Sequence, residues 1–160
     1  MSLLLALAAA AAVPQLAGEE VRRFPAAEAR QGVAVSDRLF YAIDNSSIGA
    51  YDKRTGKRLF GWKGDPALFP HLNSCSLHRA ELVCASSNYP AVPMSSSVER
   101  FDAATLRHVG SHSLGPGTGS LTWIDRHQGS WWAGFANYDG RGGEPGRDHR
   151  HTTLIRMDDE

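Results

Sequence analysis

Histidines and carboxylates gather between residues 137 and 151, in a stretch that is also rich in glycine. A histidine held by a carboxylate can act as a general base towards an ester or a lactone. The candidate catalytic residues on this reasoning are His71, Asp139, Asp148 and His149. The same carboxylates and imidazoles have donor atoms for a metal, but their spacing matches no ligand motif, and neighbouring arginines would neutralise them as ion pairs. We therefore predict no metal site, and no motif in the sequence names a cofactor.

An Asn-Tyr dipeptide occurs twice, at residues 88–89 and at residues 137–138. An amide beside an aromatic ring suits hydrogen bonding and stacking with a polar or sugar-like ligand. The alternative is that each Asn holds a turn and each Tyr covers a strand edge. The candidate ligand-binding residues are Asn73, Asn88, Tyr89, Asn137, Tyr138 and Arg147.

A repeat of strand, turn and strand must position these residues. Residues 48–60 (IGAYDKRTGKRLF) return roughly 50 positions later as residues 98–109 (VERFDAATLRHV), and a third, shorter copy is found at residues 154–158. The matched pairs are Ile48 with Val98, Tyr51 with Phe101, Asp52 with Asp102, Thr55 with Thr105 and Leu59 with Val109. A period of about 40–50 residues is typical of β-propeller blades.

The repeat predicts an all-β chain: a partial β-propeller of about three four-stranded antiparallel blades, the third of them incomplete. The expected blades are residues 32–62, 71–113 and 120–158. In antiparallel blades, the link between the second and third strands lies on the same rim as the link to the next blade. The long links of this chain all belong to that class, so we expect the candidate residues to converge on one face.

The tetrapeptide YAID at residues 41–44, the turn YDKRTGKR at residues 51–58 and Trp62 resemble the repeat of quinoprotein-like and YVTN-type propellers. In the second blade Leu106 replaces the turn glycine and no Trp follows. The polar tracts around Asn73, Asn88 and Asp139 are similar to those of uncharacterised bacterial exported propellers, some of which are labelled cycloisomerases. The resemblance implies the fold and a cycloisomerase, and the histidine–carboxylate pairs suit a lactonase. An enzyme of either kind on the long-loop face is the alternative to a binding protein.

The first 17 residues are expected to be a secretory signal peptide. The apolar run at residues 3–13 is too short for the ~20 residues that span a bilayer, and small residues near Ala17 suit cleavage. No Lys or Arg precedes the run, so a misassigned start or an uncleaved leader remains the alternative. A signal predicts a periplasmic or secreted protein, in which residues 18–31 are a linker or a strand that closes the last blade.

Two cysteines, Cys75 and Cys84, flank a predicted hairpin that turns at residues 79–80. This register sets them opposite each other on neighbouring strands. In an oxidising compartment they are expected to form a disulfide. Two buried thiols packed side by side are the alternative.

Seventeen basic residues balance seventeen acidic ones, which argues against nucleic acid or an anionic membrane surface as a partner. The expected partner is a small polar ligand or an envelope protein. A closed propeller has about four to eight blades. Two open blade faces would expose about 700 Å² of mostly apolar sheet, above the ~300–600 Å² of the largest patch on ordinary monomers. The sequence therefore predicts self-association or further blades.

Overall fold

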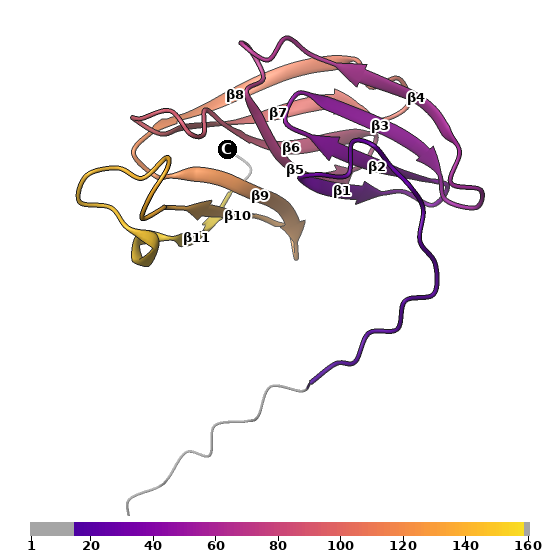
Figure 1. The fold of residues 1–160 in the computed structure, drawn as a ribbon, viewed down its shortest axis with the longest axis horizontal. Coiled ribbons are helices and arrows are strands. Elements are labelled where there is room, and N and C mark those ends of the chain that lie inside the picture. The colour runs from indigo at the N-terminus through magenta and orange to yellow at the C-terminus, as the bar shows by residue number, and fades with distance from the viewer. Residues whose placement is uncertain (1–14, 159–160) are drawn as a thin grey trace, which may run out of the picture.

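The computed structural model describes residues 15–158, which form β-strands joined by turns and contain no α-helix (Figure 1). The predicted all-β class is confirmed. The strands of the described residues are β1 Gly32–Val35, β2 Leu39–Asp44, β3 Ser47–Asp52, β4 Arg58–Lys63, β5 His71–His78, β6 Glu81–Ser87, β7 Ser95–Asp102, β8 His108–Pro116, β9 Ser120–His127, β10 Ser130–Ala136 and β11 Thr153–Met157. Most of the expected signal peptide, residues 1–14, lies outside the described residues. Within residues 15–158, no helix is long and apolar enough to cross a membrane.

The strands make three antiparallel sheets, ordered β1-β2-β3-β4, β5-β6-β7-β8 and β9-β10-β11. The first strands of successive sheets are in contact, β1 with β5 and β5 with β9. This is the arrangement of blades around an axis, so the three sheets form a partial propeller whose third blade has three strands in the described part of the chain.

The blades end at other residues than predicted, and blades one and three differ by one residue each, ending at Lys63 and Met157. Blade two continues to Pro116 rather than to residue 113. The third strand of blade three starts at Thr153, because the residues shortly before it, His149–His151, form a 3₁₀ turn. The side chain of Asp148 caps that turn by accepting a hydrogen bond from the backbone N–H of Arg150.

Apolar side chains fill the two junctions between blades. One cluster, which includes Ile43, Leu72 and Phe101, lies between blades one and two. The other, which includes Leu121 and Phe135, lies between blades two and three. Full burial of one large apolar side chain stabilises a fold by about 1.5–3 kcal/mol. These junctions therefore hold the rims in fixed positions.

The repeated turn has the same hydrogen bonds in blades one and two. Asp52 Oδ1 accepts from the backbone N–H of Thr55 at 2.7 Å, and Asp102 Oδ1 accepts from that of Thr105 at 2.8 Å. The next residue has positive φ in both turns, 74° at Gly56 and 57° at Leu106. A left-handed backbone disfavours leucine. Leu106 is only 1% exposed, so burial of its side chain offsets the strain.

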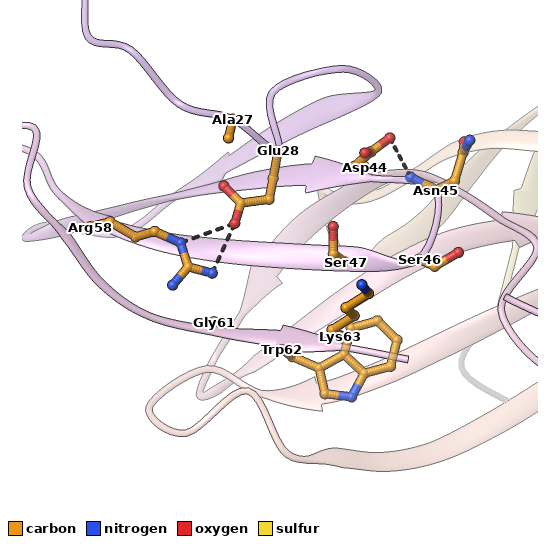
Figure 2. A pocket seen from close by; sticks show the side chains of 10 residues that line it. All are labelled: Ala27, Glu28, Asp44, Asn45, Ser46, Ser47, Arg58, Gly61, Trp62 and Lys63. Carbon is orange, nitrogen blue, oxygen red and sulfur yellow. Dashed lines mark hydrogen bonds and ion pairs between the residues drawn. The ribbon is translucent and has the colours of Figure 1, made fainter. Parts of the chain in front are cut away.

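Residues 18–31 form no strand in the described part of the chain, which leaves the linker of the two predicted alternatives. Instead the segment crosses the outer face of blade one. The ring of Phe24 stacks on Phe40 with centroids 5.9 Å apart. The carboxylate of Glu28 accepts a hydrogen bond from Tyr51. It also accepts one from Arg58 Nη2 at 2.8 Å (Figure 2). Burial would raise the pKa of Glu28, but the hydrogen bonds from Tyr51 and Arg58 lower it below its usual value.

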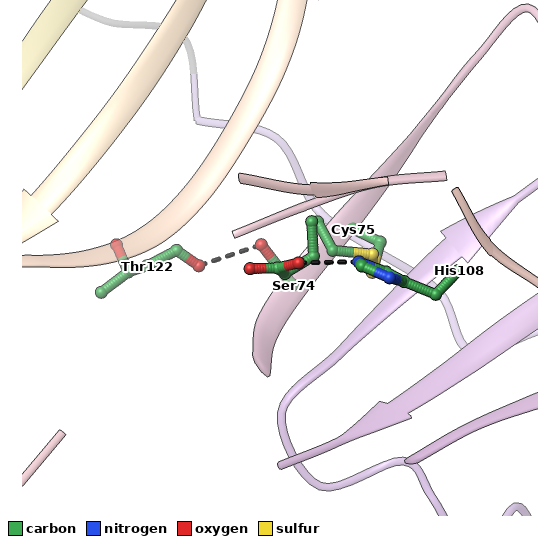
Figure 3. The surroundings of a disulfide bond; sticks show 6 residues. Ser74, Cys75, His108 and Thr122 are labelled. Carbon is green, nitrogen blue, oxygen red and sulfur yellow. Dashed lines mark hydrogen bonds and ion pairs between the residues drawn. A yellow bond between two sulfur atoms is a disulfide. The ribbon is translucent and has the colours of Figure 1, made fainter. Parts of the chain in front are cut away.

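The hairpin β5–β6 has the predicted register, with His78 opposite Glu81 and Cys75 opposite Cys84. The two cysteines form a disulfide (Figure 3). Close to it, β5 bulges, and Ser74 Oγ donates a hydrogen bond to the carbonyl oxygen of Thr122 in blade three at 2.9 Å. The disulfide therefore fixes β5, a strand through which blade two contacts blade three, to its neighbour β6.

Candidate functional site

The long loops of the three blades meet on one rim, as the topology predicts. His71 Nδ1 lies 2.8 Å from Asn45 Oδ1 in the turn between β2 and β3. The carboxylate of Glu144, in the loop between β10 and β11, accepts from the backbone N–H of Met94 in the loop between β6 and β7. These contacts join loops of neighbouring blades into one surface, which we call the loop rim.

An aromatic row runs along the loop rim from the start of blade two towards blade three. The rings of His71 and Tyr89 have centroids 5.1 Å apart, and those of Tyr89 and Tyr138 are 4.9 Å apart. All three side chains are half-buried. Burial lowers the pKa of His71 below its ordinary value, so this imidazole stays neutral at neutral pH. The row therefore presents uncharged, partly exposed rings.

The three candidate asparagines belong to the framework rather than to the exposed surface. Asn73 is buried and donates to the carbonyl oxygen of Leu121 at 2.7 Å, joining blades two and three. Asn88 bridges its own loop by donating to Pro93 and accepting from the Ser95 N–H. The side chain of Asn137 donates to His151 and Thr118 carbonyls. Hydrogen bonds already engage these amides, which favours the structural alternative for Asn in the repeated dipeptide.

The histidine–carboxylate pair that the structure brings together is His149 with Asp139. His149 Nδ1 lies 2.7 Å from Asp139 Oδ2, and the His149 backbone N–H donates to Asp139 Oδ1 at 3.1 Å. The hydrogen bond from His149 lowers the pKa of Asp139, and the same bond raises the pKa of His149. His71, the other candidate base, contacts Asn45 and Tyr89 instead.

The remaining candidate carboxylate, Asp148, has other partners. Arg150 Nε donates to it at 2.8 Å, and His151 Nδ1 lies 3.1 Å away. The hydrogen bond from Arg150 lowers the pKa of Asp148 to about 2. Donor atoms of Asp139, Asp148 and His149 lie within 4.8 Å of one another. The Arg150 guanidinium pairs with Asp148, one of the two carboxylates of this group.

A hollow of about 510 Å³ opens beside the aromatic row and is called the loop hollow here. Its walls come from the loop between β10 and β11, and they carry both signs of charge. The lining side chains that bear on function are Tyr138, Asp139, Glu144, Arg147, Asp148 and Arg150. Tyr138 thus belongs to the row and to the hollow, and it connects the two.

Two residues at the rim are missing from the predicted catalytic and ligand-binding sets. Asn45 Oδ1 accepts from Gln31 Nε2 at 2.8 Å and contacts His71 at the same distance. The repeat does mark Asn45. It directly follows the second strand of blade one, as Asn88 and Asn137 follow the second strands of the later blades. Glu144 ties two loops together across 50 residues of sequence, and no local pattern marks it.

A comparison with protein-family models gives no match, and a comparison with curated proteins gives none either. The function is therefore inferred from the geometry of the loop rim. The likeness to quinoprotein-like propellers remains a prediction that rests on the repeated strand, turn and strand.

His149 is expected to titrate above 6.5, the ordinary value for histidine, because the Asp139 carboxylate favours the imidazolium. The pair stabilises the fold fully below pH 6.5, and this contribution is lost as the pH rises through the raised pKa. Two-dimensional NMR of the imidazole resonances measures the midpoint. Asp139→Asn should return it towards 6.5, whereas Asp37→Asn, a change in the turn between β1 and β2 on the opposite rim, should leave it unchanged. An equal midpoint in wild type and Asp139→Asn would contradict the pairing.

Proposed function

We propose that this protein binds a small, polar, sugar-like ligand on its loop rim. The observation that supports this most directly is the aromatic row of His71, Tyr89 and Tyr138, which ends at the loop hollow. Flat apolar rings beside hydrogen-bonding groups suit a molecule with one apolar face and several hydroxyl groups. The row supplies the faces, and the hollow supplies the polar groups.

The charges of the hollow favour an uncharged ligand. Carboxylates of Asp139 and Asp148 accept hydrogen bonds, and the guanidinium groups of Arg147 and Arg150 donate them. Because Arg150 pairs with Asp148 and His149 pairs with Asp139, neither sign of charge is in large excess. A hydroxyl group both donates and accepts, so a polyol can bond to either kind of wall.

The proposal includes export of the chain. The apolar run at residues 3–13 supports it, and so does the disulfide between Cys75 and Cys84, since disulfides persist in oxidising compartments. Small polar solutes are ligands that a protein in such a compartment meets directly.

Binding is tested by titrating the purified protein with a panel of neutral mono- and disaccharides in calorimetry. Tyr138→Ala is expected to weaken binding about two- to tenfold, because an aromatic stacking contact contributes about 0.5–1.5 kcal/mol. Tyr138→Phe keeps the ring and serves as the matched control, and Asp37→Ala on the opposite rim should bind like the wild type. Absence of saturable binding, or binding that Tyr138→Ala leaves unchanged, would refute the proposal.

A second candidate, a lactonase or cycloisomerase, is favoured by the pair of His149 and Asp139. The neutral imidazole would take a proton from water or substrate while the carboxylate stabilises the imidazolium that forms. Turnover should then rise with pH through the raised pKa of His149 and be lost in His149→Ala. Saturable binding of lactones without turnover would leave the binding function alone.

A further inference from the structure

Blade three presents an apolar outer face. Ile124 on β9 and Ile155 on β11 pack towards blade two, so their strand neighbours Trp123 and Leu154 point away from it. These two side chains are 40% and 60% exposed. Within residues 15–158, β11 pairs with β10 alone, which leaves its other edge open.

Blade one presents a second apolar face, on the opposite side of the molecule from the first. Ala34 on β1 is buried towards blade two, so Val33 and Val35 point outwards, and each is 57% exposed. In the interior of this protein, the first strand of one blade contacts the first strand of the next. If a further blade followed blade three with the same packing, its first strand would contact β9. In a second copy of this chain that strand is β1, and it would lie against the side of β9 that carries Trp123.

The segment before β1 runs like the fourth strand of a preceding blade. Seven residues, 64–70, separate β4 from β5, and seven residues, 25–31, separate Phe24 from β1. β4 and residues 24–31 both cross to the loop rim from the opposite rim, which carries the turn between β3 and β4, since Phe24 lies against Gly56 and Gln31 bonds to Asn45.

The aromatic contacts extend this equivalence. Trp62 of β4 packs against Phe101 in the next blade, with ring centroids 4.7 Å apart. In the repeat, Tyr51 matches Phe101. The ring of Tyr51 stacks on Phe40, and Phe40 stacks on Phe24. Phe24 therefore packs on blade one about where Trp62, in the last strand of blade one, packs on blade two.

The backbone of this segment has unused hydrogen-bonding capacity. Residues 15–25 make no backbone–backbone hydrogen bond to any described residue, and Val21 is 91% exposed. Extended backbone with unsatisfied N–H and C=O groups pairs readily with the open edge of a sheet.

We propose that two copies of this chain close a ring of six blades, with residues 21–24 of each copy pairing with the open edge of β11 in the other. The two apolar faces meet at each junction, so the contact is head-to-tail and closes after two steps. Two copies of three blades give six, within the range of about four to eight for closed propellers, whereas three copies exceed it. Two junctions bury at most four blade faces, an upper bound of about 1,400 Å² because Phe24 and Glu28 already cover part of blade one, and this bound lies within the range of stable interfaces.

Sedimentation equilibrium of the full chain tests the ring. The wild type is expected to sediment as two chains. Leu154→Asp and Val21→Pro each alter an exposed residue, so both variants should keep the fold and raise the dissociation constant of the dimer at least ~10-fold. Leu68→Asp is the matched control, because Leu68 is 75% exposed but lies in the loop between β4 and β5. It should sediment like the wild type.

A cross-link locates the contact. Val21→Cys combined with Leu154→Cys should form a disulfide between two chains under mild oxidation, since Cys75 and Cys84 are already bonded to each other. A wild type that sediments as one chain overturns the proposal. So does assembly that grows beyond two chains with concentration, or a dimer that neither variant weakens.

Discussion

Phe101→Ala is expected to lower the free energy of unfolding by about 3–5 kcal/mol, the usual cost of truncating a buried Phe. Phe101 is 0% exposed at the junction of blades one and two. Rings of Trp62, Phe69 and His108 surround it, with centroids at 4.7, 6.5 and 5.1 Å. These rings come from β4, from the loop after it and from β8, so no single shift of the backbone closes the cavity. Urea unfolding measures the loss as a lower midpoint at an unchanged slope.

The matched control for this truncation is Phe101→Leu, which keeps most of the apolar volume and should cost less than about 1.5 kcal/mol. Phe24→Ala is a second comparison, because Phe24 stacks on Phe40 at the outer face of blade one but is only partly buried. It should cost less than Phe101→Ala. Equal losses at the two positions, or a loss below about 1 kcal/mol at Phe101, would mean that the blades do not pack as described.

The features that the sequence predicts well depend on local patterns. Strand, turn and strand at residues 48–60 and 98–109 follow from alternating apolar residues and from an Asp-x-x-Thr turn, whose hydrogen bonds form within four residues. The register of Cys75 and Cys84 follows from counting outwards from one tight turn. The convergence of the long loops follows from strand direction alone.

The features that escape the sequence depend on contacts between distant segments. Residues 18–31 lack periodicity, and their position is set by Phe24 and Glu28 meeting side chains of blade one. Either Asp139 or Asp148 suits His149 by residue type. The structure selects Asp139 because the 3₁₀ turn and Arg150 hold Asp148. The roles of the asparagines also depend on distant contacts. An asparagine that binds a ligand and one that joins two loops look the same in the sequence.

Removal of the disulfide by Cys75→Ala together with Cys84→Ala is expected to lower the free energy of unfolding by about 2.6 kcal/mol on the chain-entropy model. The bond closes a short loop, with a sequence separation of 9, so it restricts the unfolded chain less than a long loop would. Both cysteines are buried, at 6% and 0% exposure. Alanine is therefore preferred to serine, whose hydroxyl would need a hydrogen-bond partner there.

Comparing the alanine pair with reduced wild type separates the effect of losing the S–S bond from the effect of losing the two sulfur atoms. Reduction breaks the crosslink but keeps both sulfur atoms, so dithiothreitol should produce most of the shift in the urea midpoint and should leave the alanine pair unaffected. Ser74→Ala is the control for the bulge beside the bond, because it removes the hydrogen bond to Thr122 but keeps the crosslink. It should cost about 0.5–1.5 kcal/mol and remain sensitive to reductant. An equal urea midpoint for wild-type protein in oxidising and reducing buffer would show that the disulfide does not stabilise the fold. β5 and β6 would then pair equally well without it.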